Sequence, residues 1–319
     1  MYRYKFTVFT PCYNSANTIH RVFESLMSQT IDHSEFEWLV INDASTDNTD
    51  EIIQKYIKEA DFDVKYINLE KNQMLIRNYN LAIKKAEGEW FLPTGHDDRF
   101  EPNSLEIFWS IIRKLNIKHK DKNFFSIACL CKNQYGIKIG NDFPVCCKPV
   151  KILDIGIKWN RKKIGESWGV QKTEYMKKLF VLDNEKILNK IIYIPESFFW
   201  NKIALEGSRM NLYVYPINKR LRIYYQNSNE NLSKNIRKKY PMGFEHESMI
   251  MLNKYGKIIK NTSFKMYIKY LLKYILFGLY NKKNFLELLN NLKFTRDKIF
   301  FILFYPFAYL YKDIFFKEN

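Results

Sequence analysis

The sequence is poor in the residues that build disulfide-stapled or disordered chains. Its 319 residues include five cysteines without a C-x-x-C pair, which fits neither a disulfide framework nor a standard zinc site. Only 11 glycines and 9 prolines occur, too few for long disordered segments. We therefore expect a globular protein of a reducing, cytoplasmic compartment.

Signals for export and for membrane spanning are also missing. The chain enters an apolar strand at Lys5 without the charged leader, apolar stretch and cleavage site of a signal peptide. The longest uninterrupted apolar run, Ile299 to Tyr311, is shorter than the roughly 20 residues that a spanning helix needs. The sequence still allows the protein to lie on a membrane surface.

Acidic residues are in the minority. The chain has 51 Lys and Arg against 34 Asp and Glu, a net charge of +17, while 46% of its residues are hydrophobic and 17% aromatic. The apolar content is sufficient for a packed core. The charge indicates an anionic partner: a lipid surface, a nucleic acid or a phosphorylated small molecule.

Strand and helix patterns alternate over the first hundred residues. Strands are expected at 5–10, 37–42, 64–69 and 90–92, and helices at about 19–27, 49–59 and 74–86. This order predicts an α/β fold with a Rossmann-like, mainly parallel sheet flanked by helices. Ligands of such sheets bind beyond the carboxyl ends of the strands.

Polar clusters follow three of these strands and open one helix. They are Thr10 to Asn14, Asn42 to Asp47, Thr94 to Asp98, and Arg77-Asn78. Each cluster alone fits a helix cap or a turn, but their occurrence at one sheet edge indicates a binding site. Two adjacent acids there can hold a divalent cation. No Gly-rich phosphate loop is present, which argues against a kinase or a dehydrogenase.

These segments resemble glycosyltransferase family 2, the inverting enzymes with the GT-A fold. TVFTPCYNSANTI, WLVINDASTDNT, RNYNLAIKKAEGEWFL and the HDD loop stand in the family's order over residues 5 to 110. The resemblance implies that Thr10, Pro11, Tyr13 and Asp43 hold the uracil of a UDP-sugar. It implies that Arg77 lies near the ribose or the diphosphate.

The same resemblance implies a metal site for Mn²⁺ or Mg²⁺. Asp97-Asp98 corresponds to the family's D-x-D-type motif, with Asp98 as the direct ligand and Asp97 beside the donor. His96 stands where many members of the family have Asp. A cation placed there neutralises charge on a departing diphosphate.

Two later acids are candidates for the catalytic base. The family often has an E-D pair at the start of a helix, and Glu196-Ser197 keeps only its first acid. Inversion needs a carboxylate that takes the proton of the acceptor hydroxyl. We assign Glu196 to this role and Glu166 as the second candidate. A first-turn acid that only complements the helix dipole is the structural alternative for Glu196.

The C-terminal part differs in composition. Residues 231 to 319 contain 17 Lys and Arg and 6 Asp and Glu, which gives +11 of the total +17. Lysines interleaved with aromatic residues are typical of helices that lie on anionic membranes. Pro306 is expected to kink or end the last helix. The alternative is a helical appendage packed on the catalytic part or in a dimer.

We expect three parts: residues 1–110 for the nucleotide-sugar, 111–240 for the acceptor and base, and a helical segment, 241–319. The expected activity transfers a hexose or N-acetylhexosamine from a UDP-sugar to a growing bacterial surface glycan, such as lipopolysaccharide, capsule or a lipid-linked oligosaccharide. A non-catalytic nucleotide-sugar-binding or scaffold protein is the alternative. A nucleic-acid partner is not expected because no reading motif is present, although the basic tail alone would allow one. An oligomer is possible.

Overall fold

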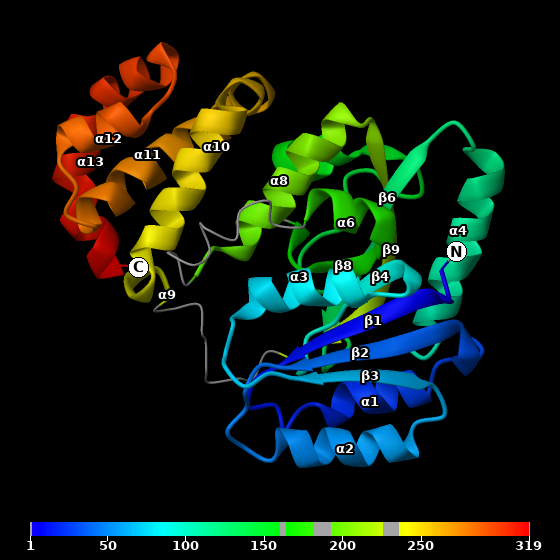
Figure 1. The fold of residues 1–319 in the computed structure, drawn as a ribbon. Coiled ribbons are helices and arrows are strands. Elements are labelled where there is room, and N and C mark those ends of the chain that lie inside the picture. The colour runs from blue at the N-terminus through cyan, green and yellow to red at the C-terminus, as the bar shows by residue number, and fades with distance from the viewer. Residues whose placement is uncertain (1, 160–163, 181–192, 226–235, 319) are drawn as a thin grey trace. The chain divides into compact units, whose positions relative to one another are not determined.

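The structure is a computed structural model that describes residues 2–159, 164–180, 193–225 and 236–318. The chain forms two compact units (Figure 1). Unit 1 comprises residues 1–155, 160–181 and 207–227, and unit 2 comprises 156–159, 182–206 and 228–319. The functional division at residues 110 and 240 stays a prediction.

Unit 1 is built on one mixed sheet with the strand order β3-β2-β1-β4-β8-β6-β9-β5, to which β7 adds by pairing with β9. The strands are β1 (Tyr4–Cys12), β2 (Phe36–Asn42), β3 (Asp63–Asn68), β4 (Gly88–Pro93), β5 (Arg99–Phe100), β6 (Asn123–Asn133), β7 (Val150–Lys151), β8 (Ser167–Lys172) and β9 (Leu212–Tyr224). β1 to β4 are parallel, as are β6 and β9, whereas β5, β7 and β8 run antiparallel to their neighbours.

Helices cover both faces of the parallel strands: α1 and α2 lie on one side of β1 to β3, and α3 lies on the other (Figure 1). The helices and turns of this unit are α1 (His20–Met27), η1 (His33–Glu35), α2 (Thr49–Glu59), α3 (Leu75–Lys85), α4 (Ser104–Lys118) and α6 (Thr173–Leu179). A π-helical turn, η2 (Asp154–Lys158), falls at the boundary with unit 2.

The core follows from the alternation of side chains along β1. Phe6 and Val8 join a buried cluster with residues of α1 and α4, whereas Phe9 packs on the other face against Tyr79 of α3. Both faces of the strand are therefore covered, and its sequence reads as a continuous apolar run. The α/β fold with a mainly parallel sheet is confirmed, and β8 and β5 are antiparallel additions that the sequence did not predict.

Sheet register brings the functional loops to one edge. Cys12 pairs with Asn42, and Asn42 pairs with Asn68, so β1, β2 and β3 end at the same level. β8 runs the opposite way between β4 and β6, and Phe91 of β4 pairs with Gln171. The start of β8, and the residues just before it, consequently lie at the edge where β4 ends.

Unit 2 is helical in its described part. Its helices are α8 (Glu196–Arg209, which crosses into unit 1 after Glu206), α9 (Ile236–Lys239), α10 (Pro241–Thr262), α11 (Phe264–Tyr280), α12 (Phe285–Asn291) and α13 (Thr295–Glu318). α10 to α13 pack on one another, and aromatic contacts join α11 to α13, as between Tyr274 and Phe301 (Figure 1). The expected helical C-terminal segment is confirmed.

The last helix differs from the expectation in two ways. Pro306 lies inside α13, which continues to Glu318, so of the two expected effects of this proline, the ending of the helix is wrong and the kink stays a prediction. Among the described residues, Thr295–Phe316 is long and apolar enough to cross a membrane by length and composition, with a mean hydropathy of 1.5. The sequence analysis counted only the uninterrupted apolar run from Ile299 to Tyr311, which is shorter than this helix. An average over a longer window also admits a few charged residues, so it includes the whole apolar length.

Candidate active site

The loops after β1 and β2 are joined by hydrogen bonds. The Asn14 backbone amide donates to Ser45 Oγ at 2.9 Å, and the Thr46 amide donates back to Asn14 Oδ1 at 2.8 Å. The Ala16 amide donates to Asp47 Oδ2 at 3.1 Å. These hydrogen bonds hold the two polar clusters against each other, as expected if each cluster forms a turn. We call this hydrogen-bonded edge at the ends of β1 and β2 the rim of the site.

Backbone strain gathers at the same rim. Asn14, Ala44 and Met74 adopt φ of +51°, +58° and +69°, a region that non-glycine residues occupy rarely. They are three of the six non-glycine residues with positive φ in the described part of the chain. Such strain is typically found at binding and catalytic sites, where the surroundings hold it in place.

Thr10 and Asp43 lie inside this rim with their side chains engaged. Thr10 is fully buried, and its Oγ1 accepts a hydrogen bond from Trp38 Nε1 at 3.0 Å. Asp43 is 4% exposed and accepts from the backbone amides of Gln73 and Met74 at 2.6 and 3.0 Å. Thr10 is thus buried in β1 and supports the strand end from within, and Asp43 fixes the start of α3 at the site.

Three other residues assigned to the nucleotide stand closer to solvent. Tyr13 is 49% exposed, and Pro11 is half-buried at the end of β1. Arg77 lies in the first turn of α3, where its Nη1 donates to the Gln73 carbonyl at 3.1 Å. An exposed ring, a rigid strand end and a guanidinium at one sheet edge can contact a base and a phosphate.

The loop after β4 is held by α1. His96 Nδ1 lies 2.8 Å from Thr18 Oγ1, and Arg21 Nη1 donates to the Asp97 carbonyl at 2.7 Å. The same guanidinium stacks 3.9 Å from the ring centre of Tyr225. Burial lowers the pKa of His96, so this ring is neutral at pH 7 and brings no positive charge to the loop. Thr18, in the turn before α1, and Arg21, in its first turn, were missed because neither position carries a signal for a partner in the loop after β4.

Asp98 is buried, and its Oδ2 pairs with the guanidinium of Arg222, whose Nε donates at 2.9 Å. Burial raises the pKa of Asp98 to about 6, against the opposing effect of Arg222. Arg222 was missed as well, because a residue 124 positions away carries no local signal for a partner at Asp98.

The two acids fit a divalent cation in different degrees. A Cβ placed on Gly95 would lie 2.8 Å from Asp97 Oδ1 and 2.9 Å from Asp98 Oδ2, so both carboxylates close around the same small space. Asp97 is half-buried, whereas Asp98 is fully buried with Oδ1 unpartnered. Asp98 Oδ2 is engaged by Arg222, so Asp97 is the more accessible of the two carboxylates. The assignment of the direct ligand stays a prediction.

No group of three or more His, Cys, Asp or Glu side chains that could hold a metal exists within residues 2–159, 164–180, 193–225 and 236–318. Asp97 and Asp98 would therefore supply only part of a coordination shell. Hard divalent cations complete such shells with phosphate oxygens and water, so the arrangement suits a cation that arrives with a diphosphate.

Glu166 lies directly before β8, at the edge where β4 ends. Burial first, and then the charges of Glu166, Asp98 and Asp97, raise the pKa of Tyr224. These acids therefore share one electrostatic neighbourhood within unit 1. The Glu166 side chain is exposed and available to a ligand.

Glu196 is the first residue of α8, in unit 2. Its side chain is exposed, and its Oε1 accepts from Trp200 Nε1 at 2.7 Å within the same helix. An acid in this position also complements the helix dipole. Its assignment as the base rests on its place in the sequence motif.

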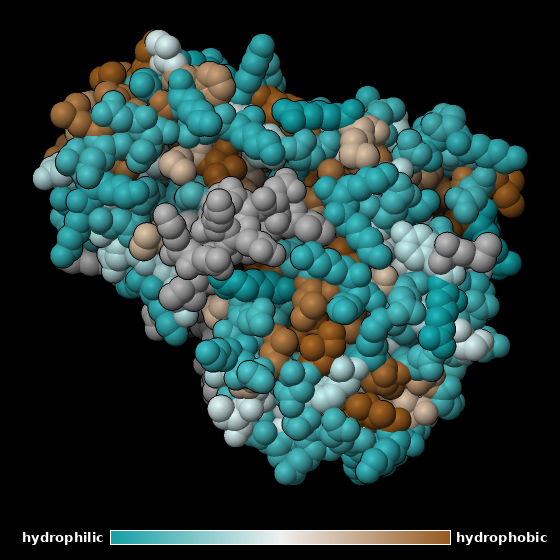
Figure 2. All heavy atoms as spheres, viewed as in Figure 1, coloured by the Kyte–Doolittle hydropathy of each residue, from teal (hydrophilic) through white to brown (hydrophobic). Residues whose placement is uncertain are grey.

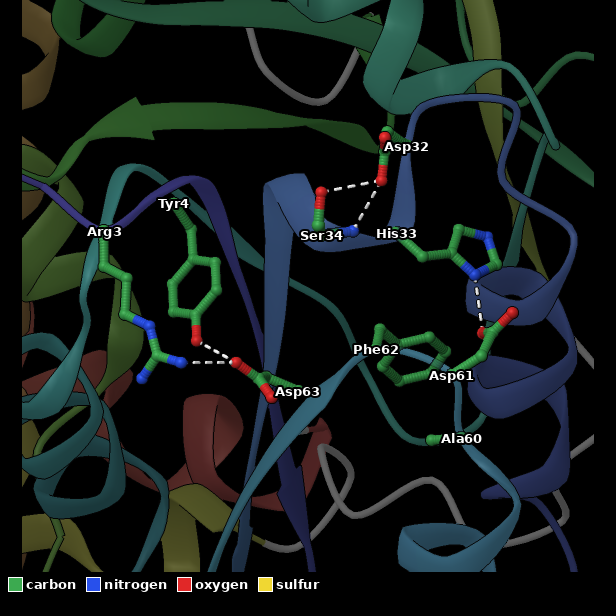
Figure 3. Close-up of a pocket in the computed structure, with 9 residues that line it drawn as sticks. All are labelled: Arg3, Tyr4, Asp32, His33, Ser34, Ala60, Asp61, Phe62 and Asp63. Atoms are coloured by element: carbon green, nitrogen blue, oxygen red, sulfur yellow. Dashed lines mark hydrogen bonds and ion pairs between the residues drawn. The ribbon is translucent and has the colours of Figure 1, made fainter.

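A separate pocket of about 640 Å³ lies at the opposite edge of the sheet, where β1 and β3 begin (Figure 3). Its polar groups satisfy one another: Arg3 and Tyr4 pair with Asp63, and His33 pairs with Asp61. These charged groups are therefore already paired with one another, although Arg3, Asp61 and Asp63 stay exposed.

Comparisons with known proteins show what the chain is similar to. The family described as Glycosyl transferase family 2 matches residues 7–117. The poly(ribitol-phosphate) β-N-acetylglucosaminyltransferase TarS of Staphylococcus aureus is 34% identical over 108 residues, which is 32% of this chain but only 18% of that protein. The uncharacterized glycosyltransferase MG060 of Mycoplasma genitalium is 30% identical over 215 residues, 63% of this chain and 71% of that protein.

A solved structure supports the fold. Residues 1–349 of S. aureus TarS, crystallised with UDP-GlcNAc, superpose with a TM-score of 0.58 at 20% identity, over 91% of this chain and 82% of that one. The fold is that of a GT-A glycosyltransferase. The chain belongs to glycosyltransferase family 2.

Proposed function

We propose that this protein is an inverting glycosyltransferase that moves a hexose or N-acetylhexosamine from a UDP-sugar to a growing bacterial surface glycan. The observation that carries the proposal is the carboxyl edge of β1 to β4, because the segments that follow these strands carry Asp43, Arg77 and Asp97. TarS was crystallised with UDP-GlcNAc, which makes UDP-GlcNAc the first donor to test.

The donor would lie across this edge. Pro11 and Tyr13 would face the uracil, supported by the buried Thr10 beside them. Asp43, which accepts from the amides of Gln73 and Met74, would hold that loop next to the uracil. Arg77 would face the ribose or the diphosphate. Glu166 would reach the sugar or the acceptor, supported by its exposure and its place beside the Asp97 loop.

A divalent cation, Mn²⁺ or Mg²⁺, would neutralise charge on the diphosphate when bound. Asp97 would hold it directly, with Asp98 fixed by Arg222 behind it. The acceptor oxygen would attack the anomeric carbon from the side opposite the diphosphate, and a carboxylate would take its proton. We assign that proton transfer to Glu196, with Glu166 as the competing residue.

The acceptor class is supported by relatives that build cell-wall polymers. TarS is named for poly(ribitol-phosphate), and a putative teichuronic acid glycosyltransferase, TuaG of Bacillus subtilis, is 31% identical over 100 residues. Lipopolysaccharide, capsule and lipid-linked oligosaccharides are the other surface glycans to test as acceptors. We place the enzyme in the cytoplasm, at the inner face of the cytoplasmic membrane, where such polymers grow.

The test is a donor panel with release of UDP as the readout, with and without Mn²⁺. Hydrolysis or transfer from UDP-GlcNAc that needs the cation supports the proposal. Tight UDP-sugar binding without turnover of any donor, in the presence of a polymer acceptor, would instead favour the alternative, a non-catalytic nucleotide-sugar-binding or scaffold protein.

A further inference from the structure

Large apolar side chains are exposed in a row along α13. Ile299, Leu303, Phe307, Leu310 and Ile314 are each 49% to 79% exposed. Their spacing of i, i+4, i+8, i+11 and i+15 puts them on one side of an α-helix. We call these five residues the α13 stripe. Figure 2 shows hydrophobic residues gathered over α12 and α13.

The opposite side of α13 is packed. Asp297 and Phe301 are fully buried, and Ala308 is 2% exposed. Phe301 contacts Tyr274 of α11 and Phe285 of α12. The α13 stripe is therefore the outer face of a helix whose inner face already has its partner, and a soluble monomer rarely exposes so many apolar side chains in one row.

Burial leaves few acidic side chains at the surface of the C-terminal helices. From residue 236 to 316 the chain has five acids, Glu245, Glu247, Glu287, Asp297 and Asp313. Three of them are buried and paired inside unit 2 with Lys283, Lys273 and Arg296. Only Glu287 and Asp313 remain as exposed acids on this stretch.

Most of the many cations on this stretch keep their charge at the surface. Lys257, Lys265, Lys269 and Lys293 are exposed, and Lys298 and Lys312 flank the apolar residues of α13. An uncovered apolar row, on a unit whose exposed charges from residue 236 to 316 are almost all positive, is complementary to an anionic lipid headgroup layer.

We propose that the α13 stripe docks the protein on an anionic bilayer, with α13 lying in the plane of the interface. Spanning is disfavoured because the inner face of α13 stays attached to charged neighbours. Lys260 lies over the Phe300 ring at 5.0 Å, and Arg296 pairs with the buried Asp297. Insertion across the bilayer would carry these charges into hydrocarbon.

The experiment uses the full chain and vesicles of phosphatidylglycerol with phosphatidylcholine, or of phosphatidylcholine alone. The wild type should float with the anionic vesicles, bind the neutral ones less, and be released by alkaline carbonate. High salt should weaken the binding by screening the lysines. Leu303→Glu with Leu310→Glu should lower binding at least about tenfold, because two buried leucines are lost from the interface.

The matched control carries the same substitutions on exposed apolar residues of unit 1. Ile117 and Ile137 are 72% and 63% exposed, comparable to Leu303 and Leu310 at 58% and 79%. Ile117→Glu with Ile137→Glu should float like the wild type. Circular dichroism and UDP affinity should be the same in both double variants, which separates a lipid effect from misfolding.

A direct probe comes from Leu310→Trp, because residues 236 to 319 contain no tryptophan. Its fluorescence should be quenched by brominated acyl chains, and that of Ile117→Trp should not. The proposal is overturned if the wild type ignores anionic vesicles, if it resists carbonate extraction, or if the stripe variant binds as well as the control. A lipid-independent dimer that the stripe variant abolishes, without vesicle binding, would assign the stripe to a second copy.

This inference deepens the proposed location of the enzyme, and its test separates the two. A chain that docks on vesicles but turns over no UDP-sugar would disprove the transferase and leave the surface standing. A protein that turns over a UDP-sugar but binds no vesicles would disprove the docking surface and leave the transferase standing.

Discussion

Asp98 accepts a hydrogen bond from Arg222, 124 positions further along the chain, at 2.9 Å from Nε to Oδ2. This pair ties the loop after β4 to the end of β9, and it lies behind the half-buried Asp97. The loop after β4, which would contact the diphosphate, is therefore held by β9, a strand separated from β4 by β8 and β6 in the sheet.

Removing the Arg222 charge should destabilise the fold. Arg222→Met leaves the buried Asp98 carboxylate without its partner, which costs about 3–5 kcal/mol in comparable buried pairs. The control is Arg99→Met, which breaks an exposed pair with Glu24 and should cost less than about 1 kcal/mol. Urea unfolding measures both, and equal losses would show that the Asp98 pair is no stronger than a surface one.

Thr10 should contribute more to the stability of the fold than to the binding of uracil. Thr10→Val keeps the shape but leaves the buried Trp38 Nε1 without its acceptor, which should cost about 1–3 kcal/mol. Thr30→Val, at an exposed site, should change stability by less than about 0.5 kcal/mol. UDP affinity of the folded Thr10→Val protein should stay within a few-fold of the wild type. A selective loss of UDP binding without destabilisation would give the hydroxyl a direct role.

Asp97 should carry the metal dependence. Asp97→Asn removes a ligand charge, so UDP release should fall by about 10² or more at fixed Mn²⁺ while the fold stays stable. Asp61→Asn, an acid at the opposite edge of the sheet, is the control and should behave as the wild type. Wild-type activity should disappear with EDTA and return with Mn²⁺. Full activity in EDTA would remove the metal from the mechanism.

The two candidate bases can be separated by matched variants. Glu196→Gln keeps size but cannot accept a proton, so transfer should fall by about 10² to 10⁴ with unchanged UDP affinity. Glu166→Gln should reduce transfer less and raise KM for the donor sugar or the acceptor. The reverse pattern would move the base to Glu166, which shares its unit with Asp97.

His96 should make stability depend on pH. Its pKa is lowered by burial, so the folded state prefers the neutral ring, and its contribution is complete above the unfolded pKa of about 6.5. That contribution should be lost as the pH falls. The stability of the wild type relative to His96→Gln should therefore decrease from pH 7 to pH 5 in parallel urea titrations. Parallel curves would show that the ring titrates equally in both states.

Local patterns predicted several elements closely. The helix expected at 49–59 is α2 (Thr49–Glu59), and the strand expected at 37–42 is β2 (Phe36–Asn42). A strand was also expected from Lys219 to Tyr225, whereas β9 begins at Leu212 and runs through Pro216. The strand accommodates that proline through register irregularities with β6 between Ala128 and Leu130.

The sequence by itself determined the alternation of strands and helices, the polar clusters at the strand ends and the resemblance to a family, because these depend on periodicity and on residues close in the chain. The tertiary structure decided which polar groups are paired with other groups of the protein and which stay accessible to a ligand. It paired Asp98 with Arg222, buried Thr10 under Trp38, brought Glu166 to the Asp97 edge through an antiparallel strand, and left the α13 stripe uncovered. Those outcomes depend on sheet register and packing between distant segments, which no local pattern encodes.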